Sequence, residues 1–481
     1  MLEGLEITEI QLSDLERTRR LDSQFYSPTN LAAAEKLAMQ GAKSITEFAT
    51  ISDGNHMSIS ESFVEEGGIP YYRGQDIYHF FIEQSPAPMQ IGEKIFRSSV
   101  MTRSHLRKGD VLMSIVGAII GNLSLVKTDV DASCSCKLAI LRPRSISPEM
   151  LATFLKSYYG QIQIQKFKRG AAQTGLILED FDQLRIPEFS DHLQKSIVSI
   201  VASAYKTTDA AKQTYAKAET ILLETIGMAD FSPSAKAVNI KSLKDSFAAT
   251  GRLDAEAYQP KYDQLRSILE SYPGGVTTID ELACQITNGA EVREYQEEGV
   301  AYLRVGDLKN LSIDASSVVK IDPASAAQGL EKIGLQVGDV LVSRSGSLAV
   351  TAVVEPEWKD ALISSHLIRL RIQDTRIDPY YLALFLSSVP GKMQIQQRSN
   401  GGVQPEISQP ALKSIVVPIP PKSTQQEIRR LILSARKLRD LSKDLLDAAK
   451  RAVEIAIEED EAAGLTYLTT SPAQKQPLTQ G

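Results

Sequence analysis

The sequence predicts an α+β protein: a tandem duplication of one α/β unit, with each copy followed by a long helix. Three observations support this prediction. Short blocks recur along the chain at a nearly constant offset, each copy mixes strand-like runs with short helical stretches, and each copy ends in a long amphipathic stretch. With 481 residues, the chain can bury more than one hydrophobic core. The two long helices are expected to pair as an antiparallel coiled coil that separates the globular parts.

The duplication rests on blocks that recur at an offset between 229 and 232 residues. For example, Arg20-Leu21-Asp22 returns as Arg252-Leu-Asp254, and the Gly-Asp-Val-Leu run at 109–112 returns at 338–341. Chance does not keep such a register over several blocks, so we interpret them as an internal repeat. The other recurring segments are 68–77 with 299–308 and 170–173 with 401–404.

Each copy is predicted to run from an N-terminal helix through short strands to a second helix, and then through a polar loop to a strand that stops at proline. The Gly-Asp pairs mark tight turns between strands. The predicted helices cover residues 31–39, 148–156, 261–270 and 379–387. The predicted strands cover residues 69–72, 111–116, 137–142, 340–343 and 367–371.

The long helices are predicted from Asp191 to Gly227 and from Ser423 to Glu458, where apolar and small residues step by alternating fours and threes. Asp191 with Gln194, and Thr424 with Glu427, form capping-box patterns at the two starts. Small residues in this seam allow two backbones to approach closely; the alternative is that each helix packs on its own domain. The seam consists of Ile197, Val201, Ala204, Ala211, Tyr215 and Leu222, and of Ile428, Ile432, Ala435, Leu446, Ala449 and Val453.

The predicted domain organisation follows from these elements. The first globular domain spans residues 1–187, the first long helix 188–228, the second globular domain 229–421 and the second long helix 422–463. Residues 464–481 are polar and proline-containing, and are predicted to be a disordered tail.

The sequence offers no catalytic pattern. There is no glycine-rich phosphate loop, no nucleophile elbow and no zinc-ligand spacing, and the five histidines are scattered. The run Asp378-Pro-Tyr-Tyr381 superficially resembles an amino-methyltransferase motif, but its repeat counterpart, Ser147-Pro-Glu-Met150, shares only a helix-start pattern. We therefore expect a protein without catalytic activity, cofactor or metal.

The composition of the sequence indicates where the protein is expected to work and which partners it is expected to bind. The sequence has no apolar run of membrane-spanning length and no secretion signal at its start, and its three cysteines are expected to be reduced thiols in the cytoplasm. The formal net charge of −6 argues against a simple nucleic-acid coat. It does not exclude DNA binding, because local fields matter more than the sum.

Together, these features resemble the specificity subunit of a type I DNA restriction–modification system. The motifs that match are the Gly-Asp-Val-Leu turn, the Gly-x-x-Gln loop and the Pro-x-Pro-Pro…Gln-Gln-Glu-Ile start of the second long helix, in duplicated order over about residues 15–460. The first long helix departs from this pattern, because it follows Ile186-Pro-Glu-Phe189 without multiple prolines.

The resemblance implies two target-recognition domains that each read half of a split double-stranded DNA sequence. It also implies two methyltransferase subunits, which bind S-adenosylmethionine and dock on the central coiled coil, and adenine as the methylated base. Whether ATP-dependent restriction subunits join stays open. A seam of about 36 residues would span roughly 55 Å, or about one and a half turns of B-DNA.

Comparison of the two copies suggests candidate DNA contacts. Positions where the copies differ are candidate base readers, since two domains that read different half-sites should share their scaffold. Shared residues such as Arg73 and Arg304 suit either phosphate contacts or internal hydrogen bonds, and basic residues in the polar loops suit phosphate. The candidates are Arg73, Gln75, Lys166, Lys168, Arg169, Gln173 and Thr174 in the first copy, and Arg304, Arg344, Ser345, Arg398, Asn400 and Gln404 in the second.

Two other functions fit the same sequence. One is a specificity subunit that serves a fused methyltransferase–nuclease of the type IIB kind. The other is a structural coiled-coil adaptor that binds protein and no DNA.

Overall fold

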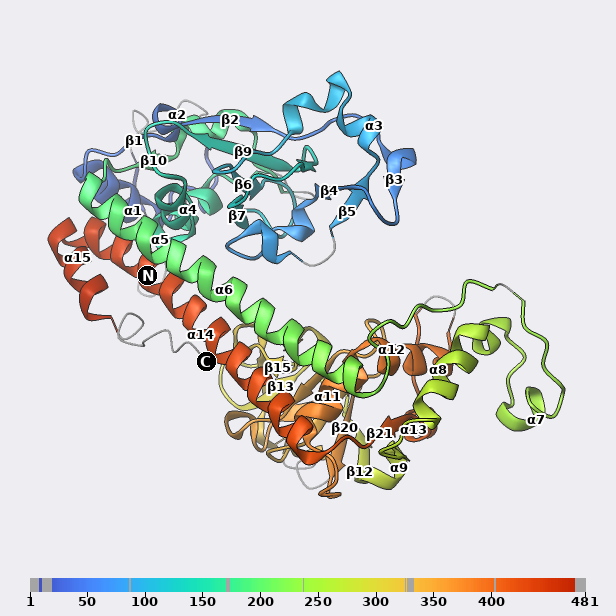
Figure 1. Cartoon of the computed structure of the whole chain (residues 1–481). Coiled ribbons are helices and arrows are strands. Elements are labelled where there is room, and N and C mark those ends of the chain that lie inside the picture. Colours follow the sequence, from blue (N-terminus) through green and yellow to red (C-terminus); the bar gives the residue numbers. More distant parts are fainter. Residues whose placement is uncertain are drawn as a thin grey trace. The chain divides into compact units, whose positions relative to one another are not determined.

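The structure, a computed structural model, describes residues 8–10, 20–85, 88–169, 174–236, 238–324, 326, 333–401 and 404–471. The chain divides into two compact units, Met1–Thr208 with Asp440–Gly481, and Asp209–Arg439. Helices and sheets mix in each unit, which confirms the α+β prediction (Figure 1). Of the helices described, none has the length and apolar composition needed to cross a membrane.

The first unit contains two four-stranded sheets, one in the order β2-β9-β6-β7 and the other in the order β3-β5-β4-β8. In the first of these sheets all three pairings are antiparallel. Its elements are α1 (Pro28–Met39), β1 (Lys43–Ser44), α2 (Ile45–Phe48), β2 (Ala49–Asp53), β3 (Phe63–Val64), β4 (Ile69–Tyr72), β5 (Met89–Ile91), α3 (Glu93–Phe96), β6 (Val111–Ser114), β7 (Leu123–Leu125), β8 (Ser133–Cys134), β9 (Leu138–Pro143), α4 (Pro148–Lys156), α5 (Tyr158–Lys166), β10 (Arg185–Ile186) and α15 (Glu461–Thr470).

The second unit repeats the first sheet, in the order β12-β20-β17-β18, and adds a three-stranded sheet in the order β16-β13-β19. The matching strand orders support the internal duplication. Its elements are α7 (Phe247–Thr250), α8 (Pro260–Glu270), β11 (Val276–Thr278), α9 (Ile279–Leu282), β12 (Ala283–Asn288), β13 (Val300–Leu303), β14 (Leu308–Lys309), β15 (Ser312–Ile313), β16 (Val319–Ile321), β17 (Val340–Ser343), β18 (Thr351–Val353), β19 (Leu362–Ile363), β20 (Leu367–Ile372), α11 (Pro379–Ser387), α12 (Val389–Arg398), α13 (Gln409–Lys413) and β21 (Val416–Pro418).

The predicted helices and strands are present, with small differences at their ends. Helices α4 and α11 begin and end at the predicted residues, because Ser147 and Asp378 cap the helices with their side chains and proline occupies the first turn. Helix α1 begins three residues earlier than predicted. Its N-cap is Ser27, whose hydroxyl accepts a hydrogen bond from the Asn30 N–H at 3.4 Å.

The long helices are α6 (Asp191–Thr225) and α14 (Lys422–Glu458), and each begins in one unit and ends in the other. In the first unit they run antiparallel, since Ser442 of α14 bonds both Thr208 and the Ala204 carbonyl of α6, at 2.7 and 2.8 Å. The small seam residues allow this close approach. The buried seam residues are Ile197, Val201, Ala204, Ala449 and Val453 in the first unit and Ala211, Leu222, Ile428, Ile432 and Ala435 in the second, while Leu446 and Tyr215 are partly buried.

The capping boxes predicted for the long helices are wrong. Before α6, the cap is Ser190, whose hydroxyl accepts from the Leu193 N–H at 3.3 Å. Gln194 instead accepts from the backbone of Ser147 at 3.0 Å and donates to the Phe189 carbonyl at 3.0 Å. A glutamine thus fastens the start of α6 to the start of α4.

The second unit repeats this arrangement at the start of α14. Gln425 accepts from the backbone N–H of Asp378 at 2.7 Å and donates to the Pro420 carbonyl at 2.9 Å. Glu427, which was predicted to complete a capping box with Thr424, pairs with Arg430 at 2.8 Å. The glutamine that follows the helix start is therefore the repeated structural residue.

The predicted disordered tail is wrong for its first part, because α15 continues to Thr470. The Asp460 carboxylate caps this helix by accepting from the Ala463 N–H at 2.8 Å. A Cβ added at Gly464 would lie 2.7 Å from the Ala452 carbonyl oxygen, so glycine allows α15 to pack against α14. Leu468 joins the core of the first unit. Residues 472–481 lie outside the described residues.

Lys156, at the end of α4, provides a pH-dependent prediction. Burial, with Lys450 adding repulsion, lowers the pKa of Lys156 to about 8 from 10.5. In the unfolded chain the amine stays charged up to about pH 10.5, so the folded state is disfavoured below pH 8 and this penalty fades between pH 8 and 10.5. We expect Lys156→Met to raise the thermal midpoint at pH 7 by a few degrees and to leave it nearly unchanged above pH 10.5.

Thermal unfolding of the wild type and Lys156→Met at pH 7 and pH 9.5 measures this effect, and the rise should be smaller at pH 9.5 because part of the penalty has faded there. Lys450→Met, which removes the repelling neighbour together with its exposed ion pair to Asp447, is the control and should produce a smaller rise. A lower midpoint for Lys156→Met at pH 7 would show that the amine stabilises the first unit.

Candidate functional site

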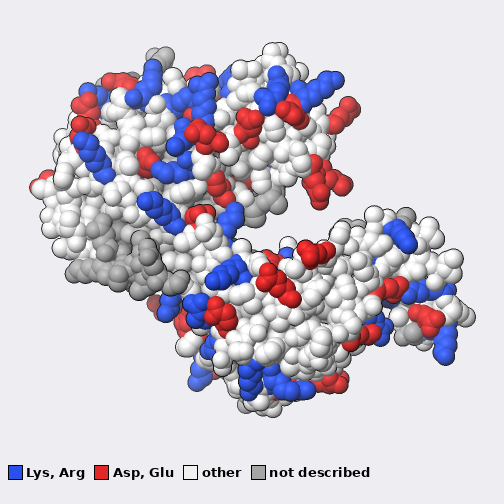
Figure 2. All heavy atoms as spheres, viewed as in Figure 1, with Lys and Arg blue, Asp and Glu red and all other residues white. Residues whose placement is uncertain are grey.

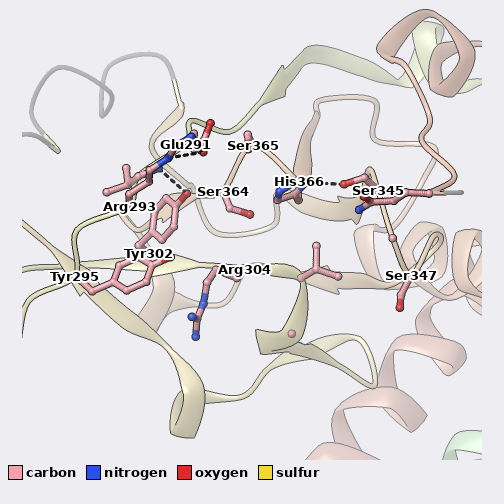
Figure 3. Close-up of a pocket in the computed structure, with 15 residues that line it drawn as sticks. Glu291, Arg293, Tyr295, Tyr302, Arg304, Ser345, Ser347, Ser364, Ser365 and His366 are labelled. Carbon is pink, nitrogen blue, oxygen red and sulfur yellow. Dashed lines mark hydrogen bonds and ion pairs between the residues drawn. The ribbon is translucent and has the colours of Figure 1, made fainter. Parts of the chain in front are cut away.

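The second unit has a cavity of about 580 Å³ that opens where segments next to β13, β17 and β19 come together (Figure 3). Its lining is mixed, with two tyrosines, four serines and several ionisable side chains. The lining residues are Glu291, Val292, Arg293, Tyr295, Tyr302, Arg304, Val305, Gly306, Ser345, Gly346, Ser347, Ser364, Ser365, His366 and Gln404.

Arg304 is positioned at one side of this cavity by the short turn that follows β13. Its backbone N–H donates to the Asp307 carboxylate at 2.7 Å, and its guanidinium donates to the Ser317 carbonyl at 2.6 Å. The guanidinium carbon lies 5.6 Å from the ring centre of Tyr295, a cation–π distance. Arg73 makes the same backbone bond to Asp76 in the first unit, at 2.8 Å. Part of the role of this shared arginine is therefore structural.

Tyr302 and Ser364 form the inner wall. The Tyr302 hydroxyl donates to the Ala290 carbonyl at 2.7 Å and accepts from the Val292 N–H at 3.3 Å, and burial raises the pKa of Tyr302. Ser364 lies between Tyr302 and His366 (Figure 3). It is only 5% exposed, and its hydroxyl has no hydrogen-bond partner among the described residues. A buried hydroxyl without a partner is available to a ligand.

A second cavity of about 200 Å³ shares part of this lining. Ser345 and His366 form a hydrogen bond of 2.6 Å between the hydroxyl and Nδ1 (Figure 3). Arg344, the preceding residue, pairs with the Glu406 carboxylate. This smaller cavity is lined by Arg344, Ser345, Ser365, His366, Gln404 and Glu406.

The loop that carries Gln404 is fastened at its base by backbone bonds. Asn400 and Glu406 exchange two N–H···O bonds of 2.8 Å, and the Gly346 N–H donates to the Pro405 carbonyl at 3.3 Å. Gly401 has a φ of +103°, and a Cβ there would lie 2.5 Å from the Gln404 carbonyl oxygen. Glycine is therefore needed for the turn that brings Gln404 into the lining of both cavities.

The first unit fastens the equivalent loop in the same way. Arg169 and Gly175 exchange two N–H···O bonds of 3.0 and 2.8 Å, and the Gly117 N–H donates to the Thr174 carbonyl at 2.9 Å. Gln173, the counterpart of Gln404, lies outside the described residues. The backbone scaffold is shared, whereas the side chains that it carries differ.

Several predicted contacts in the first unit already have internal partners. The guanidinium of Arg169 pairs with Asp180, and the Lys166 amine lies 4.3 Å from the ring centre of Phe25. At Lys168 only the backbone takes part in such a contact, since its carbonyl accepts from Arg20 at 3.2 Å. Gln75 is exposed on the turn after β4, where the second unit has glycine.

Arg398 does not line either of these two cavities. Its guanidinium donates to the Ser414 hydroxyl at 2.9 Å and to the Gln394 carbonyl at 3.2 Å, at the end of α12. Burial lowers the pKa of Arg398 to about 10. Asn400 acts through its backbone, as the partner of Glu406 at the loop base. The structure thus gathers Arg304, Arg344, Ser345 and Gln404 at one site.

Sequence reasoning missed Tyr295, Ser364, His366 and Glu406. His366 corresponds to Lys137 at the repeat offset. The His366 carbonyl accepts from the N–H of Arg344, the residue after β17, at 2.8 Å, and the Lys137 carbonyl accepts from the N–H of Ile115, the residue after β6, at 3.1 Å. A longer comparison of the two copies could have found this pair, because the two residues directly precede β9 and β20, which are equivalent strands of the two sheets.

In the described part of the chain, no group of three or more histidine, cysteine, aspartate or glutamate side chains could hold a metal ion. Cys134, Cys136 and Cys284 are free thiols. Acidic and basic side chains are interspersed on the face shown in Figure 2. The site offers hydrogen-bond donors, acceptors and aromatic surface, which suit recognition of a polar ligand.

Comparison with known proteins relates part of this chain to a family of DNA specificity domains. Residues 275–451 match the family model of the type I restriction modification DNA specificity domain. That region belongs to this family of DNA specificity domains, and the match covers most of the second unit and most of α14.

Curated relatives extend the similarity along the chain. The chain is 25% identical over 152 residues to a putative type I restriction enzyme MjaX specificity subunit of Methanocaldococcus jannaschii, which covers 31% of this chain and 36% of the relative. It is 23% identical over 324 residues to the type I restriction enzyme StySPI specificity subunit of Salmonella potsdam. This match covers 66% of this chain and 64% of the relative. The chain thus spans about a third and just under two thirds of these relatives.

Two solved structures are also similar to this chain. One is the type I restriction–modification S subunit from M. genitalium, with a TM-score of 0.40 at 13% identity, over 87% of this chain and 94% of that one. The other is the HsdS subunit from Thermoanaerobacter tengcongensis, with a TM-score of 0.27 at 15% identity. This match covers 89% of this chain and 96% of that one. The family match and the curated relatives confirm the resemblance to type I specificity subunits predicted from the sequence.

Proposed function

We propose that this chain is the DNA-recognising subunit of a type I restriction–modification complex, that each unit reads one half of a bipartite target, and that it has no catalytic activity of its own. The observation that supports this most directly is the shared loop base. Backbone bonds fasten the loop between Arg169 and Gly175 in the first unit, and the loop between Asn400 and Glu406 in the second.

The side chains on this shared base explain how one scaffold can read two sequences. Val116 and Lys137 occupy the positions that Ser345 and His366 occupy in the second unit. Backbone and phosphate contacts position a protein on DNA, whereas side chains at base edges specify the sequence. Two units with one docking geometry and different polar groups therefore suit two different half-sites.

The proposed complex also contains two methyltransferase subunits docked on the α6–α14 pair, and S-adenosylmethionine is bound by those subunits. It works in the cytoplasm, where ATP-dependent restriction subunits or a fused methyltransferase–nuclease are the partners that supply cleavage. The support for this assembly is the family match together with the two long helices, each of which passes from one unit to the other.

The test combines methylome sequencing with binding measurements. We expect a split motif with an unread gap to lose methylation when the gene is deleted, and to regain it on complementation. For the full chain with its methyltransferase, affinity for that motif should fall steeply as salt rises, by a log–log slope of about 0.9 per neutralised phosphate. Retained methylation, or binding without sequence preference or salt dependence, would contradict the proposal and favour a structural adaptor.

A further inference from the structure

Arg344 and Glu406 form an ion pair at the smaller cavity of the second unit. Arg344 directly follows β17, and its backbone is fixed on both sides. Its N–H donates to the His366 carbonyl at 2.8 Å, and its own carbonyl accepts from the Ile407 N–H at 2.9 Å. The side chain therefore leaves the sheet from a rigid position rather than from a mobile loop.

The arginine fork keeps donors for a ligand. The ion pair with Glu406 uses one terminal nitrogen, so the other terminal nitrogen keeps its donors, while Nε is buried away from solvent. The side chains of Arg344 and Glu406 are 30% and 48% exposed, so both are accessible from solvent. Ser364, the buried hydroxyl without a described partner, lines the adjoining cavity.

The first unit lacks this ion pair although it keeps the backbone arrangement. Ile115 occupies the position of Arg344 and makes the same two backbone bonds, from its N–H to the Lys137 carbonyl at 3.1 Å and from the Leu176 N–H to its carbonyl at 2.9 Å. Gly175 occupies the position of Glu406. The two charges are therefore specific to the second unit, and the fold itself does not require them.

We propose that Arg344 reads a guanine in the half-site of the second unit, and that Glu406 is a positioning residue that orients the arginine fork. The inference rests on the proposed function. The planar fork of arginine matches O6 and N7 of guanine in the major groove. Because the Glu406 carboxylate holds the Arg344 guanidinium in place before DNA binds, the arginine loses less rotamer freedom on binding. Because Ile115 has no donor, the first unit reads no guanine at the equivalent position.

The decisive measurement uses the wild-type chain in complex with its methyltransferase. After methylome sequencing defines the target, each guanine of the second half-site is replaced in turn by 7-deazaguanine, which lacks N7. We expect one position to lose about 10-fold in affinity, in line with the discrimination of a bidentate arginine–guanine pair. Equal affinity at every substituted position would overturn the inference, whereas a wild-type complex without a preferred sequence would overturn the proposed function itself.

Three variants then connect that guanine with the ion pair. Arg344→Met should lower affinity for the unmodified target and remove the 7-deazaguanine effect, while Glu406→Gln should weaken the guanine preference. Glu406→Asp should restore part of it, which a purely structural role would not predict. Asp374→Asn is the matched control, since Asp374 pairs with Arg376 at 2.7 Å outside both cavities. An unchanged guanine preference in a folded Arg344→Met variant would overturn the assignment.

Discussion

Replacement of Asp339 by alanine is expected to destabilise the second unit by about 3–5 kcal/mol, the usual cost of leaving a buried charge without its partner. Asp339 is 2% exposed and accepts two bonds from Arg371, at 2.9 and 2.8 Å, and one from the Gln336 N–H at 2.9 Å. These bonds fasten the Gly338-Asp339 turn to strand β20. Alanine removes the carboxylate partner of Arg371, which keeps only the Gly334 carbonyl and the Gln285 amide oxygen, and leaves the Gln336 N–H without its acceptor.

Chemical denaturation, with probes that follow each unit separately, measures this loss. Asp110→Ala should produce a similar loss in the first unit, since Asp110 makes the same bonds to Arg142, at 2.7 and 2.8 Å, and to the Arg107 N–H at 2.9 Å. Glu357→Ala, at an exposed surface pair, should cost under about 1 kcal/mol. A loss below about 1 kcal/mol for Asp339→Ala would show that water replaces the carboxylate.

Gly391→Ala is expected to cost about 3 kcal/mol or more, because α12 begins directly against the end of α11. An added Cβ would collide with the Phe385 carbonyl oxygen and lie 2.5 Å from the Cα of Leu386. Both are backbone atoms, so no side-chain rotation relieves the contact. The two helices would have to separate, and the core residues of α11 would lose packing with them.

The controls for this prediction come from other glycines. Gly160→Ala should have a similar effect in the first unit, where a Cβ would meet the Phe154 carbonyl and lie 2.6 Å from the Cα of Leu155. Gly306→Ala places its Cβ in open space and should change stability little. Denaturation of all three variants tests the comparison, and equal stability of Gly391→Ala and Gly306→Ala would contradict the packing argument.

The sequence was sufficient to predict features that depend on local rules or on repetition. The duplication, the bounds of α4 and α11 and the extent of the long helices all follow from periodicity, prolines and the recurring blocks. The capping boxes were wrong because a distant partner competes for the same side chain. Gln194 and Gln425 bond the starts of α4 and α11, and no local pattern reveals that contact.

The candidate site was predictable only in part, for a similar reason. Arg304, Arg344, Ser345 and Gln404 were found because the repeat aligns them. His366 and Glu406 were missed because hydrogen bonds across the sheet and loop place them beside those residues. Arg369 illustrates the same difficulty. Burial lowers its pKa, and its terminal nitrogens donate to Gly334, Gln285 and Thr287, contacts that the strand sequence does not reveal.

The core of the first unit includes Leu441, Ala449 and Val453 of α14 and Leu468 of α15, alongside Phe25 and Ile197. During translation, the ribosome synthesises all of residues 209–439 before these helical residues emerge. The second unit is contiguous in sequence, whereas the first exposes the apolar face of α6 until residues 440–470 have been synthesised. A nascent chain stalled before Asp440 is therefore a substrate for chaperones or proteases in its N-terminal part, residues 1–208, and not in the part synthesised last.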